Sequence, residues 1–598
     1  MQEVSTPSRS PSSRMREPSS KALENIANDA TLFAINTTIY PLADPKNDAE
    51  MLASPQRKEW IEADLAELQA LRLKDTWRLV PPPTDGSKVT GSRFVRKVKW
   101  QQNSHYDEAV MPKTEAYAVK QFKSRLVYQG YGMEKGVDFA ESYAAVVTSD
   151  AERILTCIAI WFGLWILSVD FDNFFLNGKM KEEKPVYMKQ PPRYEDKDHP
   201  DWVCELVGSL YGHPTAPLRA QEKQVEAMAE AGFHRLPSEP MMFNRHEKGE
   251  ANCCVTFHVD DGKGVTSDRT IFDNMVKSLR KSGLGCKVDE KPVKFLGLNY
   301  DYTTYKGSVL VHQRHNVEQF ILSLGLQDAK PQFTPMDPRI DLNGDDDQPP
   351  GVPCNYKEKK LYQSLAGQAI WLLRTRYDAC YAINARCRKM AAPDKEDLVL
   401  MKRLGRFFKG TPKLGLIFNP SPKNGKIPKT FVYVDCGLRI KTVSGLAGFI
   451  GEPDYVRHIN LNAAVAAFTQ TERAKVTSTM MGEVVSIERG VVFCEYTANL
   501  RQEMGYPQDG PGIIFTDSQP AIRFLTGTGA LPNRQTRHHR RQVEYIKDRI
   551  ARNIVVLKYV PSALNCADVL TKALPRVLFM RHVNNLIGRW PGQGPQLH

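Results

Sequence analysis

Apolar residues recur along this chain at helical and at strand spacing, so helices and strands are predicted over most of its length. In residues 59–75 the period is helical, and a Ser-Pro pair upstream suits a helix start; the apolar positions are Trp60, Ile61, Leu65, Leu68 and Leu71. The most apolar segment covers residues 154–169 and is interrupted by Gly163. It is too short to span a bilayer with ease, so it predicts a buried helix, a glycine stop and a buried strand.

The pattern changes character at several points and predicts six regions. The start is rich in Ser, Pro and Arg, which is typical of disorder, whereas an acidic, proline-rich stretch later in the chain is typical of a linker. The regions are a poorly ordered tail at 1–50, mixed strands and helices at 51–339, the linker at 340–356, a helical region at 357–425, an α/β alternation at 426–585 and a tail at 586–598.

Composition narrows the class of protein. The chain has 598 residues, of which 41% are hydrophobic, and is long enough for several cores. Its formal net charge of +13 favours a polyanionic partner, most simply a nucleic acid, although a basic enzyme without such a partner would carry the same charge. The 11 cysteines include no C-x-x-C pair, so we expect a reducing compartment rather than disulfides or a zinc finger. We expect no membrane partner.

Two apolar stretches end on carboxylates. The segment CCVTFHVDDGKG carries Asp260 and Asp261, and LSVDFDNFFLNG carries Asp170 at the end of another apolar run. Neighbouring carboxylates repel each other unless a cation lies between them, so the three aspartates predict a divalent-metal site at one sheet edge. Asp-Asp-Gly is also ordinary hairpin sequence, and from these residues alone both interpretations stand.

The last third of the chain carries four more acidic positions. Asp435 lies in a predicted strand, Glu483 in a predicted helix, Asp517 at the end of the strand GIIFTDSQ and Asp568 in NCADVLTKAL. They are either four unrelated surface acids or a second set of metal ligands. Between the last two, NRQTRHHRRQVEYIKDR gathers positive charge suited to phosphate contacts, and its candidate nucleic-acid-binding residues are Arg534, Arg537, His538, Arg540 and Arg541.

The order of these motifs resembles the reverse transcriptase and RNase H end of copia-type LTR retrotransposon Pol proteins. The resemblance covers residues 57–585 and is carried by DTWRLVPPP, FKSRLVYQGYGMEKGVDFAESYAAVV, SVDFDNFFLNG, VYMKQPP, VCELVGSLYG, HVDD, KFLGLNY, FTPM, YQSLAGQAIWLLRTRYDACYAIN, LMKRLGRFFKGT and ADVLTKAL. It implies a multidomain α+β and α/β fold, in which a right-hand polymerase of fingers, palm and thumb is followed by a connection and an RNase H-like α/β domain.

For the first site, the resemblance implies that Asp170 is the first palm aspartate and that Asp260 and Asp261 are the pair on the palm hairpin. It implies two Mg²⁺ ions in each active site, with Mn²⁺ as the alternative ion. The hairpin carries His258 where Tyr is usual in the family.

The resemblance also assigns substrate contacts. Phe175 matches the steric-gate position that favours dNTPs, and Lys123 and Arg125 match basic fingers residues that grip the triphosphate. Core packing for Phe175 and a solvated strand face for the two basic residues are the alternatives. The family usually reads SLYGLKQAPR where this chain reads SLYGHPTAPLR, so Thr215 replaces the glutamine expected near the nucleotide and offers fewer hydrogen bonds.

For the last third, the resemblance implies an RNase H site in which Asp435, Glu483, Asp517 and Asp568 bind two Mg²⁺ ions. The stretch VDCGL around Asp435 lacks the second aspartate and the tryptophan that the family usually carries there.

The leading interpretation is an RNA-directed and DNA-directed DNA polymerase with RNase H activity that copies retrotransposon RNA into cDNA. The expected partners are an RNA template, a DNA primer, an RNA–DNA hybrid and dNTPs, together with a tRNA primer and other proteins of the element. The expected location is intracellular, in cytoplasmic virus-like particles or the nucleus. The alternatives are a degenerate relic that only binds nucleic acid and a cellular nuclease that uses the C-terminal site alone.

Overall fold

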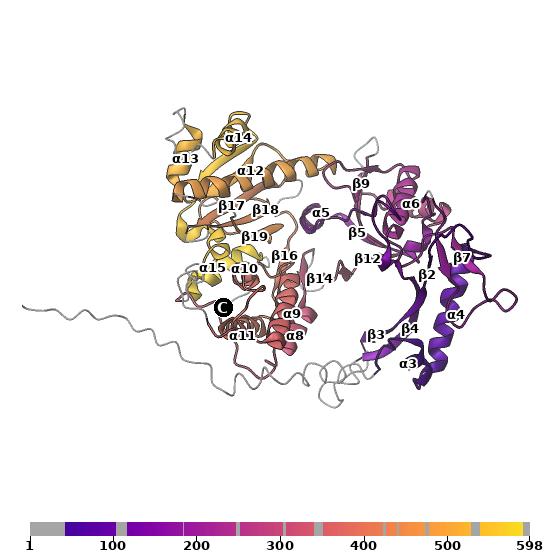
Figure 1. The fold of residues 1–598 in the computed structure, drawn as a ribbon. Coiled ribbons are helices and arrows are strands. Elements are labelled where there is room, and N and C mark those ends of the chain that lie inside the picture. Colours follow the sequence, from indigo (N-terminus) through magenta and orange to yellow (C-terminus); the bar gives the residue numbers. More distant parts are fainter. Residues whose placement is uncertain are drawn as a thin grey trace, which may run out of the picture.

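The structure is a computed structural model, and it describes residues 42–102, 117–182, 184–246, 252–302, 307–339, 351–422, 426–438, 442–472, 476, 478–527 and 539–589. Figure 1 shows the N-terminal elements, in indigo, on one side of the molecule and the C-terminal elements, in orange and yellow, on the other. Within the described ranges, no helix combines the length and the apolar character needed to cross a membrane.

The N-terminal region pairs two helices with a long two-stranded ribbon and a small sheet of order β1-β7-β6-β2. Its elements are α3 (Asp48–Ala53), α4 (Arg57–Leu73), β1 (Trp77–Val80), β2 (Val89–Thr90), β3 (Ser92–Gln102), β4 (Tyr117–Tyr128), η2 (Gly130–Gly132), β6 (Tyr187–Lys189) and β7 (Val203–Leu206). Helix α3 begins inside the predicted tail 1–50, because Asn47 caps it and Asp44 accepts a hydrogen bond from the Val98 amide at 2.7 Å. Residues 1–41 of that tail lie outside the described residues.

Helix α4 differs from its predicted amphipathic pattern in one respect. Leu68 and Leu71 are buried as expected, but Leu65 is half exposed and the acidic Asp64 is fully buried. Asp64 is stable there because Arg96 donates to both its carboxylate oxygens, at 3.0 and 2.7 Å, and the Ser124 hydroxyl donates at 2.6 Å. The helix is therefore fastened to the ribbon by a buried ion pair as well as by apolar contact.

A six-stranded sheet of order β12-β5-β11-β10-β9-β8 follows, with β5 and β11 near its centre. The elements are α5 (Ser149–Phe162), β5 (Trp165–Phe171), η3 (Phe174–Asn177), α6 (Ala216–Glu230), β8 (His234–Arg235), β9 (Met242–His246), β10 (Asn252–His258), β11 (Asp261–Thr266), α7 (Arg269–Lys281) and β12 (Cys286–Glu290). The predicted helix, glycine stop and strand at 154–169 are confirmed, since Gly163 ends α5 in the left-handed conformation and β5 follows.

A helical layer and a four-stranded sheet of order β13-β14-β15-β16 form the middle of the molecule. The elements are β13 (Lys294–Phe295), β14 (Leu298–Asp301), β15 (Val309–His312), α8 (Arg314–Ser323), α9 (Tyr356–Leu372), η4 (Tyr377–Ala379), α10 (Cys380–Cys387), α11 (Lys395–Gly410) and β16 (Gly415–Phe418). The region predicted as a linker, 340–356, does not separate two bodies: α8 packs against α9 and α11, and β15 pairs with β16. Residues 340–350 lie outside the described part.

The C-terminal α/β domain, residues 429–586, contains a five-stranded sheet of order β19-β18-β17-β20-β21. Its elements are β17 (Lys429–Gly437), β18 (Val443–Gly451), β19 (Ala466–Thr471), α12 (Thr479–Glu503), β20 (Gly512–Thr516), α13 (Gln519–Thr526), α14 (Arg540–Ala551), β21 (Val555–Tyr559), η6 (Ser562–Leu564), η7 (Cys566–Leu570) and α15 (Arg576–Leu586). The first three strands are antiparallel, whereas β17, β20 and β21 run parallel, so the sheet is mixed. The strands and helices of this domain give the α/β alternation expected for this part of the chain.

Helix α5 joins the six-stranded sheet to the C-terminal domain, and Figure 1 shows it between them. The buried Arg153 donates to the Val465 carbonyl at 2.7 Å, and the Trp161 indole donates to the Lys426 carbonyl at 2.8 Å. At the end of α12, Glu503 accepts hydrogen bonds from both the amide and the hydroxyl of Ser238. The two parts share one continuous apolar core rather than touching at a solvated surface.

Helix α5 is also tied to the strand that follows the Asp260-Asp261 pair. Lys263 of β11 is fully buried and forms an ion pair with Glu152 of α5, whose carboxylate also accepts a hydrogen bond from the Tyr300 hydroxyl at 2.6 Å. Burial by itself would raise the pKa of Glu152, but attraction to Lys263 keeps that pKa below its ordinary value. The lysine of the sequence GKG is thus buried within β11 rather than exposed in a turn.

We predict that Arg153→Met lowers the stability of the whole chain. The change leaves the Val465 carbonyl without its donor, and an unsatisfied buried group costs about 1–3 kcal/mol. The measurement is the urea midpoint of the first unfolding transition. The matched control is Arg314→Met, which removes an exposed ion pair with Glu318 and should cost less than about 1 kcal/mol. Equal midpoints for the two variants would contradict a shared core.

Candidate active sites

The first candidate site is formed where β5 meets the β10–β11 hairpin. The turn of the hairpin is Val259–Asp260, and Asp261 is paired with His258 across it. On the other side of β11, Asp261 is paired with Asp170 of β5, so these two side chains share one face of the sheet. The Phe171 amide donates to the Asp260 carbonyl at 3.1 Å, which fixes the turn beside β5. The fold thus gathers the three predicted aspartates.

The hairpin turn has an uncommon backbone. Val259 has φ of +62°, in the left-handed region that β-branched residues rarely occupy. A Cβ at Gly262 would lie 2.6 Å from the Phe257 ring, so only glycine fits the close packing behind the turn. The strained turn and the tight packing hold the Asp260-Asp261 pair in a defined place.

Burial and like charge together set the electrostatics of this site. Burial, with the nearby Asp260 carboxylate, raises the pKa of Asp170. Burial likewise raises the pKa of Asp261 to about 6, although its carboxylate accepts a hydrogen bond from the Leu296 amide at 3.3 Å. Lys287 of β12 is paired with Asp170 on the strand's other edge and offsets part of the repulsion. Lys287 belongs to no motif recognised in the sequence, so its place beside Asp170 was not predicted.

Three of the predicted substrate residues lie on β4 and on η3, the short helix that follows β5. Lys123 and Arg125 are on β4, half-buried and exposed respectively, and Phe175 is a half-buried residue of η3. Burial, followed by the neighbouring Arg125 and Lys99 charges, lowers the pKa of Lys123, while Glu67 and Asp170 oppose that effect. The buried Glu67 carboxylate accepts a hydrogen bond from the Leu126 amide at 3.2 Å, and burial raises its pKa. Two cations and an acid therefore line one side of the site.

The structure corrects the prediction for Thr215. Its side chain is 1% exposed, so it cannot contact a substrate as a surface residue would. The hydroxyl donates to Glu182 Oε1 at 2.7 Å and lies 2.9 Å from Nδ1 of His213, and Arg219 lies 3.4 Å from the same carboxylate oxygen. Thr215 lies at the start of α6, where it holds the Glu182 carboxylate. The sequence did not indicate this buried contact.

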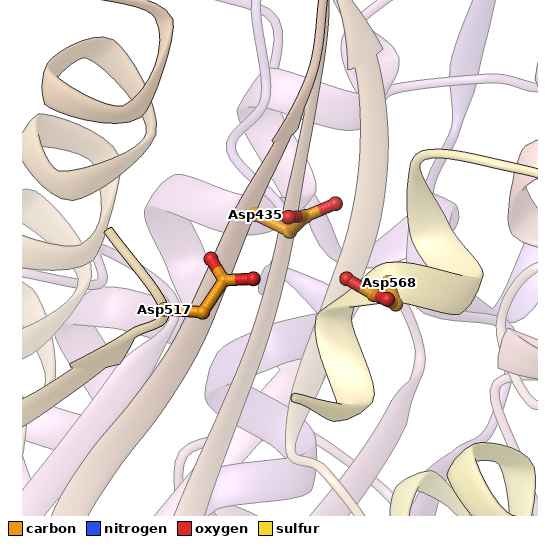
Figure 2. Close-up of side chains that lie close together, drawn as sticks. All are labelled: Asp435, Asp517 and Asp568. Carbon is orange, nitrogen blue, oxygen red and sulfur yellow. The ribbon is translucent and has the colours of Figure 1, made fainter. Parts of the chain in front are cut away.

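The second candidate site lies in the C-terminal domain, where three carboxylates from different elements converge. Asp435 is on β17, Asp517 follows β20 and Asp568 is in η7, and Figure 2 shows their carboxylates turned toward one another. One oxygen from each lies within 4.8 Å of the others. This is the only such group of three or more potential metal ligands found among the described residues, so the aspartates of the first site are more widely spaced.

Glu483 of α12 completes the second site. It is 5% exposed, Asp435 is 3% exposed and Asp568 is 4% exposed. Burial, together with the neighbouring Asp435 and Asp517 charges, raises the pKa of Glu483 to about 9. Burial and the Asp435 charge raise the pKa of Asp568 to about 7. Glu483 Oε2 is buried and has no hydrogen-bond partner among the described residues.

Neighbouring side chains hold these carboxylates in place. The Thr571 hydroxyl donates to Asp435, the Ser562 hydroxyl donates to Asp517, and Lys572 lies 3.1 Å from Asp568. One lysine does not neutralise four acids, and an orphaned carboxylate oxygen points to a missing positive partner. The donor set of hard carboxylate oxygens, with hydroxyls orienting them, fits a divalent cation such as Mg²⁺.

The predicted nucleic-acid-binding residues are only partly described. Arg540 and Arg541 are exposed at the start of α14, and Arg540 pairs with Glu544 at 2.7 Å. Arg534, Arg537 and His538 lie outside the described residues.

We predict that metal-free protein loses stability as pH rises from about 5 to 9. The raised pKa of Glu483 means that the folded state keeps a proton that the unfolded state has lost, so stability falls by at most about 1.4 kcal/mol per pH unit. Urea midpoints in chelator at several pH values test this. Glu483→Gln should flatten the slope, whereas Glu544→Gln, at an exposed ion pair, should not. An unchanged slope in Glu483→Gln would rule out the buried proton.

We predict that Thr215→Gln, which restores the usual family residue, destabilises the protein. The larger side chain overfills a buried site and displaces the hydroxyl from Glu182, at a cost of about 1–3 kcal/mol. The melting temperature measures the effect, with Thr215→Ser as the control because it keeps the hydroxyl. A glutamine variant as stable as the serine variant would mean that the site can open to accept a longer side chain.

Comparison with known proteins places the chain among retrotransposon proteins. Residues 74–338 match the family described as "Reverse transcriptase (RNA-dependent DNA polymerase)". The chain is 24% identical over 559 residues to the Retrovirus-related Pol polyprotein from transposon RE1 of Arabidopsis thaliana, covering 93% of this chain and 35% of that protein. It is 23% identical over 542 residues to the Pol polyprotein from transposon TNT 1-94 of Nicotiana tabacum, covering 90% of this chain and 38% of that protein. The chain thus spans little more than a third of the length of these relatives.

Among solved structures, the chain is similar to a foamy viral protease-reverse transcriptase in complex with double-stranded DNA, at 9% identity and a TM-score of 0.42, over 85% of this chain and 82% of that one. The sequence matches to Pol polyproteins extend over most of the chain. The resemblance inferred from the motifs is confirmed: this chain is related to the Pol polyproteins of copia-type retrotransposons, and residues 74–338 carry a reverse transcriptase domain.

Proposed function

We propose that this chain is an RNA- and DNA-directed DNA polymerase with a linked RNase H activity, which copies retrotransposon RNA into cDNA. The observation that carries the proposal is the juxtaposition of Asp170, Asp260 and Asp261 at the end of β5 and β11, inside the domain that matches the reverse transcriptase family. The six-stranded sheet would be the palm, and the β3–β4 ribbon would belong to the fingers.

In this proposal Asp170, Asp260 and Asp261 hold two Mg²⁺ ions, or Mn²⁺ in their place. Such ions activate a primer 3′-hydroxyl and neutralise charge on the leaving pyrophosphate. The pKa values of Asp170 and Asp261 are raised because burial and like charge disfavour two carboxylates close together. A bound cation would stabilise their deprotonated forms, which are the forms that bind metal. The chain's own residues supply position rather than covalent chemistry, since the β5–β11 pairing fixes where the carboxylates lie.

Lys123 and Arg125 would contact the triphosphate of an incoming dNTP, and Phe175 would exclude a ribose 2′-hydroxyl. The positions of the two basic residues on β4, near Asp170, support this assignment. Burial and the neighbouring Arg125 charge disfavour the charged form of Lys123. A bound triphosphate would stabilise that form, because it supplies negative charge beside the ammonium group.

In the C-terminal domain, Asp435, Glu483, Asp517 and Asp568 would hold two further Mg²⁺ ions that direct a water at the RNA strand of a hybrid. Support comes from the 4.8 Å clustering of three carboxylates and from the unpartnered Glu483 oxygen among the described residues. The exposed Arg540 and Arg541 would contact phosphates beside this site.

We predict that the two activities can be removed separately. Asp260→Asn should abolish primer extension on an RNA template and leave cleavage of an RNA–DNA hybrid unchanged, and Asp517→Asn should do the reverse, because the acids lie in different domains. Both assays contain Mg²⁺ and use the full chain. A folded wild-type chain that binds RNA without extending a primer would favour the relic, and loss of both activities in either folded variant would refute two independent sites.

A further inference from the structure

One aromatic side chain contacts two of the three residues assigned to the nucleotide. The guanidinium of Arg125 lies over the Tyr211 ring, 5.1 Å from its centroid, in a cation–π geometry. The other side of the contact is Phe175, whose ring centroid lies 5.7 Å from that of Tyr211 at an interplanar angle of 63°. Tyr211 therefore stands between the basic residue and the proposed steric gate.

Tyr211 also sits where two apolar cores meet. It packs against the N-terminal core that contains Leu126 and Tyr128, whereas Phe175 packs against the core of the six-stranded sheet. The Tyr128 amide of β4 donates to the Tyr211 carbonyl at 2.8 Å, so the backbone holding this ring is fixed to the strand that carries Lys123 and Arg125.

The ring contacts continue toward the catalytic aspartates. Phe175 contacts Phe174 edge-on at 5.6 Å, and Phe174 stacks on Phe171 at 5.6 Å. Phe171 is the residue after Asp170 on β5. A movement of Tyr211 would therefore be transmitted to the gate and toward the strand that carries Asp170, because close-packed rings do not shift singly.

The charges around Tyr211 make its ring the feature that can hold Arg125 in place. The nearby acid, Glu67, is buried and its pKa is raised by burial, which weakens it as an ionic partner. Arg125 also makes a side-chain hydrogen bond with the Tyr211 hydroxyl, which uses one of its five donors, whereas a bidentate carboxylate partner would occupy two. Arg125 is exposed and so can offer those donors to a bound anion.

We propose that Tyr211 is a positioning residue that sets nucleotide selectivity, holding Arg125 toward the triphosphate and Phe175 against the sugar of a deoxyribonucleoside triphosphate. This inference rests on the proposed polymerase function. No motif in the sequence marked Tyr211 for this role, since its neighbours along the chain do not include either partner.

The test compares Tyr211→Met, which removes the ring at similar volume, with Tyr211→Phe, which keeps the ring and removes the hydroxyl. Single-nucleotide extension on an RNA template gives kcat and KM for dNTP and rNTP. In the methionine variant we expect the KM for dNTP to rise about tenfold and the preference for dNTP over rNTP to fall. The phenylalanine variant keeps the cation–π contact and loses only the hydrogen bond between the hydroxyl and Arg125, so its KM for dNTP should rise less than that of the methionine variant. Tyr131→Leu, at a residue 91% exposed in the neighbouring loop, is the control for aromatic loss.

The outcomes separate this inference from the proposed function. A folded wild-type chain that incorporates no dNTP contradicts the polymerase assignment itself. Wild-type activity with unchanged KM and selectivity in Tyr211→Met overturns the role of Tyr211 alone. A fall in kcat with unchanged KM also overturns it, because that pattern reports general damage. If Tyr211→Met does not fold, a double-mutant cycle of Tyr211→Leu and Arg125→Met decides the question. Additive effects of these two changes on the KM for dNTP would contradict coupling through the ring.

Discussion

The buried ion pair between Lys263 and Glu152 is the interaction on which the arrangement of this molecule depends. Lys263 lies two residues after Asp261, Glu152 lies on the helix that enters the C-terminal domain, and Tyr300 of the middle sheet donates to the same carboxylate. A buried pair adds little net stability, but removing one partner leaves an uncompensated charge, so such a pair fixes one arrangement and excludes others. Here it fixes the strand of the first site relative to both neighbouring regions.

Both candidate sites bring several carboxylates close together in spite of their mutual repulsion, and they do so in different ways. At the first site, backbone pairing places the carboxylates, and Lys287 and solvent moderate their repulsion. At the second, carboxylates come from a strand, a helix, a strand end and a 3-10 turn, and burial raises the pKa of Glu483 to about 9 and that of Asp568 to about 7. A buried cluster of this kind is stable only because Thr571, Ser562 and Lys572 each supply a partner to one acid.

The shared core also changes how the domains relate to each other. Two domains joined by a flexible tether could move independently, but here Arg153, Trp161 and Glu503 make hydrogen bonds between the region of the six-stranded sheet and the C-terminal part of the chain. Helix α8, before the stretch predicted as a linker, contacts α9 and α11 after it, so the described elements on either side belong to one packed layer. The elements that carry the two candidate sites therefore belong to one packed body.

The sequence by itself determined the family and singled out seven acidic positions as candidates, because motifs such as HVDD and ADVLTKAL place carboxylates in recognisable local patterns. The helix, glycine stop and strand at 154–169 followed from apolar pattern and a left-handed glycine. The tertiary structure decided what depends on distant partners: that Thr215 is buried against Glu182, that Lys263 points into the core, that Leu65 is exposed while Asp64 is buried, and that Tyr211 lies between Arg125 and Phe175. Spacing along a chain gives the face of a helix or strand, but the partner that makes a buried polar group stable comes from elsewhere in the fold.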